Sequence, residues 1–244
     1  MKFLVIFFLD IFDFFYRLNL VNFLKKNNIH EFDTIFDIGA HKGESIKFFN
    51  KYFKVNKIYS FEPSPKNFKY LQKYIDNNKF KSSVVLENLG LGIKSEKKIL
   101  NQTIDSSSST FNEINYDSKY FKKKKNLLNF FSNKEYSSKI EVNVISLKNY
   151  IIDNKIKKID LLKIDTEGFE FDVLLGLEEE IKKVKFVFFE HHYDDMYKKN
   201  YKYSNVSKLL KENNFKILHK NKMPFRKTFE YLWSNNEKIN LNNS

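Results

Sequence analysis

The 244-residue chain contains no cysteine, which excludes disulfide bonds, thiolate metal sites and a cysteine nucleophile. Arginine is nearly absent too: of 43 lysine and arginine residues, only Arg17 and Arg226 are arginine. Because arginine is the side chain best suited to bidentate recognition of phosphates and bases, its scarcity argues against a nucleic-acid partner. We therefore attribute the formal net charge of +13 to a solvated surface rich in lysine.

Glycine is also rare, and its six residues form three pairs: Gly39/Gly43, Gly90/Gly92 and Gly168/Gly176. A glycine that persists in such a composition indicates a positive φ or a close approach of the backbone to another group. The first pair lies in the segment around which the chain is organised. An apolar run at residues 34–38 precedes it and includes Asp37, and a helical pattern starts at residue 45. This order predicts a strand, a tight loop and a helix, which is typical of a nucleotide-type site in an α/β fold.

The spacing within this loop indicates its ligand. A dinucleotide site needs G-x-G-x-x-G, whereas this loop is D-x-G-x-x-x-G and has an acid before its first glycine. An acidic strand end suits an ammonium or sulfonium group better than two phosphates. Glu62 ends the next apolar run, where an acid usually receives ribose hydroxyls. We infer that the ligand is S-adenosyl-L-methionine, and that the amides at the start of the helix can hold a carboxylate.

Four further segments follow in order: Phe-Glu-Pro-Ser-Pro at 61–65, Asn-Leu-Gly-Leu-Gly at 88–92, Leu-Lys-Ile-Asp-Thr-Glu-Gly-Phe-Glu at 162–170 and Phe-Glu-His-His at 189–192. Together with the first loop, they resemble the FkbM family of S-adenosylmethionine-dependent methyltransferases. The resemblance implies an α/β fold with a doubly wound, mostly parallel, seven-stranded class I methyltransferase (Rossmann-like) sheet and a C-terminal antiparallel hairpin. It also implies a hydroxyl acceptor on a sugar, a glycolipid or a natural product.

The motifs and the resemblance together predict a donor site from several loops. Its residues are Asp37, Gly39, Ala40, His41, Gly43, Glu62, Pro63, Asn88, Gly90 and Asp165. His41 stands where members of the family often carry asparagine, and we expect it near the methionine end of the donor.

The hydrophobic periodicity predicts alternating strands and helices, joined by right-handed crossovers. Strands are expected at 34–38, 58–61, 84–89, 159–164 and 184–190, an antiparallel pair at 97–102 and 140–145, and a closing hairpin at 215–219 and 228–233. Helices are expected at 45–52, 67–74, 147–152, 168–175 and from residue 204, with Pro63 and Pro65 excluding an earlier start to the second. We divide the chain into an N-terminal apolar helix (1–30), a methyltransferase domain (31–234) with an insertion at about 103–139, and a C-terminal tail (235–244).

Residues 1–24 are dense in large apolar side chains, but Asp10, Asp13 and Arg17 interrupt them. Each charge at mid-bilayer costs about 2.5–3.5 kcal/mol on insertion scales, which argues against a spanning helix. The three charges fall on one stripe of a helix. Two interpretations stay open: a helix packed on the domain or on a partner subunit, and a helix lying in a membrane interface. We expect a cytoplasmic protein, which the second interpretation would place at the inner membrane face. The oligomeric state is left open.

Methyl transfer to a hydroxyl needs a group that removes the acceptor's proton, and general base catalysis typically contributes 10²–10⁴-fold. Asp165 and Glu167 follow one predicted strand, and Glu190, His191 and His192 end the next. If the two strands are neighbours, these side chains converge. We predict Asp165 and His191 as the catalytic pair, with Glu167 positioning the donor or the acceptor. Successive residues of an extended segment point in opposite directions, so only one histidine should enter the site.

Several alternatives stay open. The same carboxylates and imidazole could bind a divalent cation, although no ligand spacing assigns one. A nucleic-acid methyltransferase would need an Asp/Asn-Pro-Pro-aromatic segment or a catalytic cysteine, and neither is present. A non-catalytic scaffold would be favoured by loss of Asp37, Glu62 or Asp165, and all three are present. In the insertion, Ser109 and Thr110 are further site candidates, and the lysines at 122–125 form either a solvated face or part of a lid.

Overall fold

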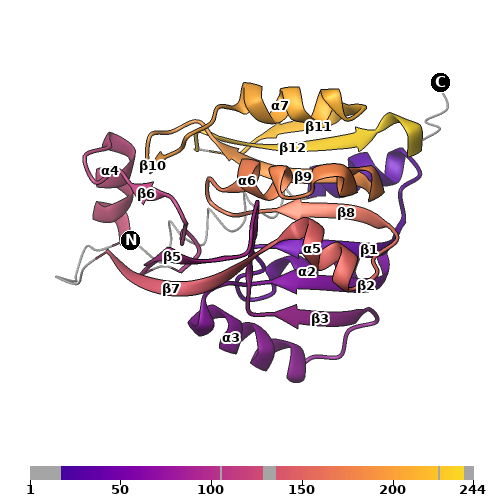
Figure 1. Ribbon diagram of the computed structural model, residues 1–244, viewed down its shortest axis with the longest axis horizontal. Helices are drawn as coiled ribbons and strands as arrows, with labels where there is room; N and C mark the ends of the chain where they lie inside the picture. The colour runs from indigo at the N-terminus through magenta and orange to yellow at the C-terminus, as the bar shows by residue number, and fades with distance from the viewer. Residues whose placement is uncertain (1–17, 105, 129–135, 225, 239–244) are drawn as a thin grey trace.

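The computed structural model describes residues 18–104, 106–128, 136–224 and 226–238 (Figure 1). Its central sheet consists of β1 (Glu31–Ile38), β2 (Lys54–Phe61), β3 (Ser83–Glu87), β8 (Ile159–Ile164), β9 (Val184–His192), β11 (Phe215–Lys222) and β12 (Thr228–Asn235). These seven strands lie in the order β11-β12-β9-β8-β1-β2-β3. The five strands from β9 to β3 are parallel to one another, and the hairpin of β11 and β12 joins β9 antiparallel. The predicted fold class is confirmed.

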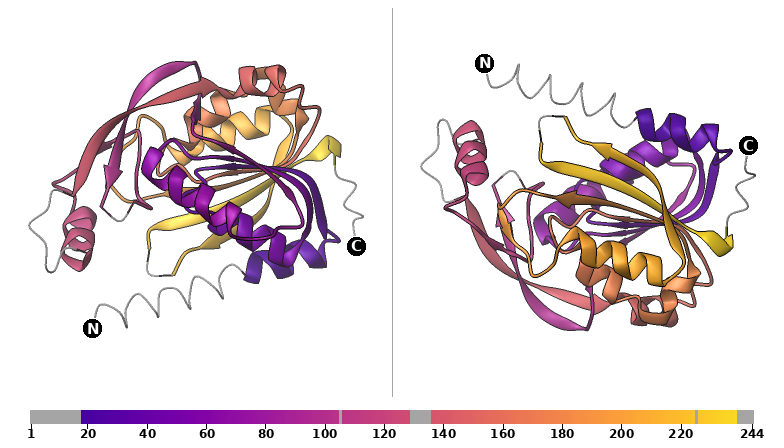
Figure 2. Two further views of the ribbon diagram at one scale, coloured as in Figure 1. Left: turned by 90° about the horizontal axis from the view of Figure 1, so that it is seen from below. Right: turned by 90° about the horizontal axis from the view of Figure 1, so that it is seen from above.

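Helices cover both faces of the sheet (Figure 2). The helices are α2 (Glu44–Tyr52), α3 (Pro65–Asp76), α5 (Leu147–Asp153), α6 (Glu170–Leu175) and α7 (Tyr203–Glu212), with 3-10 turns at Glu178–Lys183 and Asn236–Lys238. One core cluster joins α5, α6 and α7 to one face, and a second joins α2 and α3 to the other. Alternation along β9 separates the two clusters, because Phe186 belongs to the second and Val187 to the first.

The start of α3 corrects the prediction that Pro63 and Pro65 delay this helix. Pro65 is the first residue of α3, a position where proline is favoured because its missing N–H would have no partner within the helix. Ser64 caps the helix, since its side chain accepts a hydrogen bond from the backbone N–H of Asn67. Ser64 as the cap and Pro65 as the first helical residue therefore mark where the helix begins.

The insertion and the strands that flank it form a small second layer at one end of the sheet (Figure 1). Within the insertion lie β6 (Glu113–Ile114) and α4 (Lys119–Leu128). The strands around it are β4 (Gly90–Gly92), β5 (Glu96–Thr103), β7 (Ser137–Ser146) and, from beyond β9, β10 (Tyr197–Lys198). Strands β5 and β7 pair antiparallel as predicted, and β6 pairs with β10. The lysine run lies on α4, where Lys122 and Lys123 are exposed and Phe121 is buried against Tyr136 and Tyr197.

The helix at residues 18–26 packs on the same face as α2, with Leu20, Val21 and Leu24 buried in its core cluster. Asp10, Asp13 and Arg17, on which the choice between the two N-terminal interpretations depends, lie outside the described residues. Residues 239–244 of the predicted tail also lie outside them. Within the part of the chain that the structure describes, every helix is too short or too polar to span a bilayer.

Candidate active site

A cavity of about 1520 Å³ opens where β1, β2, β8 and β9 reach their carboxyl ends. Open α/β sheets bind their ligands at this edge. The loop after β1 lines one part of the cavity, and the ends of β8 and β9 line another. Residues 106–111 and part of α4 complete the wall from the side of the insertion. The cavity therefore collects most of the segments that the sequence motifs single out.

The loop after β1 is shaped by Gly39, whose φ is +82°. A Cβ at this position would lie 1.9 Å from the backbone oxygen of Asp165, so the close approach is to the end of β8 rather than to a ligand. The backbone N–H groups of Gly39 and Ala40 both donate to the carbonyl oxygen of Phe61, at 3.0 Å each. The loop is thus fastened to β2 and β8, and both residues line the cavity.

The second glycine of the loop, Gly43, is the N-cap of α2 with a φ of 95° and does not line the cavity. Glu44, the first residue of α2, turns its own carboxylate back onto this loop. Glu44 Oε2 accepts a hydrogen bond from the Lys42 amide at 3.1 Å, and Glu44 Oε1 lies 3.1 Å from His41 Nδ1. Burial raises the pKa of Glu44, but the bonds from His41 and Lys42 outweigh it and lower the pKa to about 2.

Glu62 presents a fixed carboxylate to the cavity from the end of β2. Its Oε2 accepts from the His41 amide at 2.9 Å, and its Oε1 accepts from the Ser64 amide at 2.9 Å. Burial raises the pKa of Glu62 to about 7, against the lowering effect of these bonds. The His41 ring lines the cavity, and its Nε2 lies 2.7 Å from Ser106 Oγ, which ties the donor loop to the insertion.

Asp37 lies beneath the cavity instead of on its wall, and its side chain is fully buried. Its Oδ1 is 3.0 Å from Lys163 Nζ, and the same Nζ is 3.4 Å from Asp165 Oδ2. Burial raises the pKa of Asp37, and the Lys163 ammonium opposes that effect. The structure thus places Asp37 behind the wall, and its contact with the donor stays a prediction. Lys163 was missed, although it precedes Asp165 by two residues and so shares its face of β8.

Two other predicted donor residues also support the wall from behind. Asn88 Nδ2 donates to the carbonyl oxygens of Glu62 and Pro63, at 2.8 and 3.2 Å. Gly90 starts β4 and packs against Phe111 and Val144. Pro63 lines the cavity as predicted, and so do Leu89 and Leu91, which flank Gly90. In this structure Asn88 and Gly90 therefore support the wall, and their contact with the donor stays a prediction.

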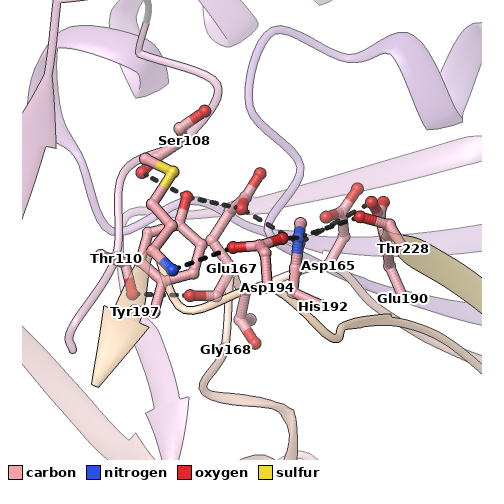
Figure 3. Close-up of polar contacts among 12 residues, drawn as sticks. Ser108, Thr110, Asp165, Glu167, Gly168, Glu190, His192, Asp194, Tyr197 and Thr228 are labelled. Atoms are coloured by element: carbon pink, nitrogen blue, oxygen red, sulfur yellow. Dashed lines mark hydrogen bonds and ion pairs between the residues drawn. The ribbon is translucent and has the colours of Figure 1, made fainter. Parts of the chain in front are cut away.

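Beyond the donor loop, the predicted carboxylates come together because β8 and β9 are neighbouring parallel strands. Asp165, Glu167, Glu190 and His192 all line the cavity (Figure 3). His192 Nε2 lies 3.1 Å from Glu167 Oε2 and 3.7 Å from Glu190 Oε1. The Asp165 side chain is 38% exposed, against 11–16% for the other three, so it extends furthest into the open space.

The histidine that enters the cavity is His192, so the choice of His191 is corrected. His191 points to the opposite face of β9, is 3% exposed and lies among the rings of Tyr193, Tyr201 and Tyr203. Burial lowers the pKa of His191 to about 3, so the ring is neutral. The rule that only one of two successive histidines faces the site holds, but alternation alone does not say which one.

The surroundings of His192 favour its protonated form. Burial lowers the pKa of His192, but Glu167, Asp194 and Glu190 together raise it well above its usual range. Its Nδ1 lies 3.2 Å from Thr228 Oγ1 and 3.7 Å from Asp194 Oδ2. Burial and the nearby carboxylates also raise the pKa of Glu190. The cluster can therefore hold, accept and release protons.

Two further candidates from the insertion, Ser109 and Thr110, both line the cavity. Among the described residues, no group of three or more histidine, aspartate and glutamate side chains has an arrangement that could hold a metal ion.

The sequence profile described as Methyltransferase FkbM domain matches residues 37–217 of this chain. No curated protein matches it. A solved FkbM methyltransferase from Methylobacillus flagellatus KT has 16% identity and a TM-score of 0.49, covering 82% of this chain and 43% of that one. An S-adenosylmethionine-dependent methyltransferase from Clostridium acetobutylicum has 12% identity and a TM-score of 0.47, covering 90% of each chain. M. capricolum TrmK, solved with S-adenosyl-homocysteine, has 14% identity and a TM-score of 0.46, covering 91% of this chain and 68% of that one. This chain thus spans less than half the length of the first of these proteins.

Proposed function

Because the chain belongs to the FkbM family of methyltransferases, we propose that it transfers a methyl group from S-adenosyl-L-methionine to a hydroxyl group of a sugar, a glycolipid or a natural product. The observation that carries this proposal is the cluster of Asp165, Glu167 and His192 in the same cavity as the donor loop. A donor and a proton-accepting group must share one cavity for such a reaction.

The residues of the donor side fit S-adenosyl-L-methionine. Glu62 is held by two backbone amides and by Asn67 Nδ2, which leaves Oε2 a lone pair for a ribose hydroxyl. Leu89, Leu91 and Phe111 supply an apolar wall of the kind that an adenine ring packs against. The carboxylates of Asp165 and Glu167 suit a positively charged sulfonium. The donor supplies a methyl carbon that is already activated, so the protein has to orient the acceptor and remove its proton.

On the acceptor side, we assign proton removal to Asp165. It is the most exposed acid of the cluster, and its Oδ2 lies 3.4 Å from Lys163 Nζ. The acceptor oxygen attacks the methyl carbon, the carbon–sulfur bond breaks, and the hydroxyl proton passes to the Asp165 carboxylate. The His192 imidazolium, 3.1 Å from Glu167, offsets the negative charge of the neighbouring acids. Glu167 keeps its predicted role of positioning the donor or the acceptor.

The charges on the cavity wall support a neutral, hydroxyl-rich acceptor. In a chain of net charge +13, nine acidic side chains line the cavity against five lysine and arginine side chains. The acids are Glu44, Glu62, Asp117, Asp165, Glu167, Glu190, Asp194, Asp195 and Glu230, and the bases are Lys119, Lys123, Lys163, Arg226 and Lys227. The pKa values of Glu62 and Glu190 are raised and His192 adds a positive charge, so the lining is nearly balanced in charge. It lacks the positive excess that contacts to phosphate groups require, which disfavours a nucleic acid. At about 1520 Å³, the cavity exceeds the roughly 300–1,000 Å³ of an ordinary ligand pocket, which leaves space for a donor and a sizeable acceptor.

Calorimetric titration with S-adenosyl-L-methionine and with S-adenosyl-homocysteine tests the donor site. We expect both to bind, and Glu62→Ala to weaken both. A panel of monosaccharides, glycosides, glycolipids and a short RNA, assayed by release of S-adenosyl-homocysteine, then tests the acceptor class. Asp165→Asn should abolish release, whereas Asp153→Asn, which removes an exposed carboxylate of α5, should not. Absence of donor binding, or turnover with RNA alone, would contradict the proposal.

A further inference from the structure

Glu167 has a backbone conformation that is uncommon for a residue other than glycine. Its φ is 53° and that of the following Gly168 is 98°, both in the left-handed region. A residue with a Cβ adopts this conformation at a cost, so contacts from outside the segment have to hold it there. Glu170 Oε1 accepts from the Gly168 amide at 2.8 Å, which holds the N–H end of the peptide between Glu167 and Gly168 but not the Glu167 carboxylate.

The carbonyl of Glu167 is held by the insertion. Thr110 Oγ1 donates to it at 2.7 Å across 57 positions of sequence, and Asn112 Nδ2 donates to the carbonyl of Gly168 at 2.6 Å. Thr110 itself is 1% exposed and is fixed by a backbone bridge to Asn101 of β5, with hydrogen bonds in both directions. Thr110 thus holds the carbonyl end of the peptide that Glu170 holds at its N–H end.

The carboxylate of Glu167 is held by Tyr197. The Tyr197 hydroxyl donates to Glu167 Oε2 at 2.7 Å, and the same hydroxyl lies 3.3 Å from the Ser108 carbonyl oxygen (Figure 3). Tyr197 is 4% exposed, and its backbone pairs with Ile114 in the β6–β10 ladder. That ladder joins β10 to β6 of the insertion that carries Thr110, so the two anchors lie in one connected unit. Glu167 Oε2 is the oxygen that lies 3.1 Å from His192 Nε2.

We propose that Thr110 and Tyr197 are positioning residues, which hold the Glu167 backbone and carboxylate so that Oε2 faces His192 inside the cavity. This inference rests on the proposed function, because it gives the insertion a part in the same reaction. The insertion then serves as a scaffold for the catalytic loop as well as a cover over the cavity.

The ring of His192 reports on this geometry without any ligand. Its facing charged groups are Glu167 from the loop after β8, Glu190 from its own strand, and Asp194 from the loop that follows β9. If Glu167 leaves its position, the ring loses one of three opposite charges, and its pKa falls. The titration can be followed by NMR of the intact protein labelled at histidine, with His192 assigned from the signal that disappears in His192→Gln.

We expect the pKa of His192 to fall by about one unit in Tyr197→Phe and in Thr110→Val, each of which removes one hydroxyl and preserves shape. Thr110→Ser, which keeps the hydroxyl, should restore the wild-type titration. Tyr116→Phe is the matched control, since it removes an exposed tyrosine hydroxyl elsewhere in the insertion, bonded to Ser137 at 2.9 Å. Once an acceptor is known, kcat should fall on the order of 10–100-fold in the two hydroxyl-deleted variants with donor affinity unchanged.

Unchanged His192 titration in both Tyr197→Phe and Thr110→Val would overturn the inference. If Thr110→Val does not fold, as judged by circular dichroism, Tyr197→Phe decides alone. The titration needs neither donor nor acceptor, so it gives its answer even if calorimetry shows that the wild-type protein binds no S-adenosyl-L-methionine. That separate result would remove the proposed function and not the positioning of Glu167.

Discussion

The two sides of the cavity are built in different ways. On the donor side, the Glu62 carboxylate is held by backbone amides 2 and 21 positions away, within one strand–loop–helix–strand unit. On the acceptor side, Glu167 is held by side chains 57 and 30 positions away, from the insertion and from β10. A site built from contiguous segments leaves a compact motif in the sequence, whereas a site assembled from distant segments leaves separate residues that only the fold brings together.

Lys163 joins the two sides, and its removal should have the largest effect. Lys163→Met leaves the fully buried Asp37 carboxylate without its ammonium at 3.0 Å, which should cost about 3–5 kcal/mol of unfolding free energy at pH 7. The cost should shrink as the pH falls, because Asp37 then binds a proton. Urea unfolding of Lys163→Met and of the double variant with Asp37→Asn measures this. Equal stability of the single and the double variant would show that the pair is unimportant.

Gly39→Ala should displace the donor loop from its backbone contact with Asp165 and so destabilise the protein. The left-handed φ and the 1.9 Å approach of a Cβ to the Asp165 oxygen together should cost about 3 kcal/mol or more. Gly43→Ala is the matched control, since its φ is also positive but its Cβ would meet the side chain of Tyr74 at 2.8 Å, which can move. We expect a loss of about 1–2 kcal/mol there. Equal denaturant midpoints for the two variants would argue against the backbone contact.

Substitutions of the two adjacent histidines should have different effects, because His192 lines the cavity and His191 lies in the core behind it. His192→Gln should lower turnover by about 10²-fold, because it removes the cation among Glu167, Glu190 and Asp194. His191→Gln should leave turnover within a few-fold of wild type.

Acid sensitivity distinguishes the same two residues. The folded-state pKa of His191 is lowered to about 3, so the unfolded chain binds the extra proton, and wild-type stability should fall as the pH decreases from 6.5 toward 3. His191→Gln should remove on the order of 2–4 kcal/mol of that decrease. A large loss of turnover in His191→Gln would reinstate His191 as the catalytic histidine.

Glu62 offers the smallest and most local test, a pH dependence of donor binding. Since the pKa of Glu62 is raised to about 7, donor affinity should increase about tenfold from pH 6 to pH 8 as the carboxylate forms. Glu62→Gln should bind more weakly, with little dependence on pH. Stability should change in the opposite sense. Between pH 4.5 and about 7 the folded protein retains a proton on Glu62 that the unfolded chain has lost, so the unfolding free energy of the wild type falls as the pH rises through that interval. Calorimetry at three pH values measures the first effect; a flat wild-type profile would place Glu62 away from the donor.

The sheet and its chain order could be predicted because apolar runs, alternation and glycine positions are local signals. The placement of Glu62, Asp165 and Glu167 at strand ends followed from the same signals, and all three line the cavity. The choice between His191 and His192 could not be predicted, because it depends on which face of β9 meets α2 and which meets α7. Gly43, Asn88 and Gly90 were assigned to the ligand because a sequence motif does not distinguish a residue that contacts the ligand from one that supports the wall behind it.

What the sequence determined by itself is the α/β sheet and the set of acidic side chains that reach its carboxyl edge, because each depends on a few neighbouring residues. Tertiary structure decided that Asp37 pairs with Lys163, that His192 faces the cavity and that Thr110 and Tyr197 hold Glu167. These contacts span tens to more than a hundred residues. A chain encodes them only through the packing of whole elements, so no short stretch of it reveals them.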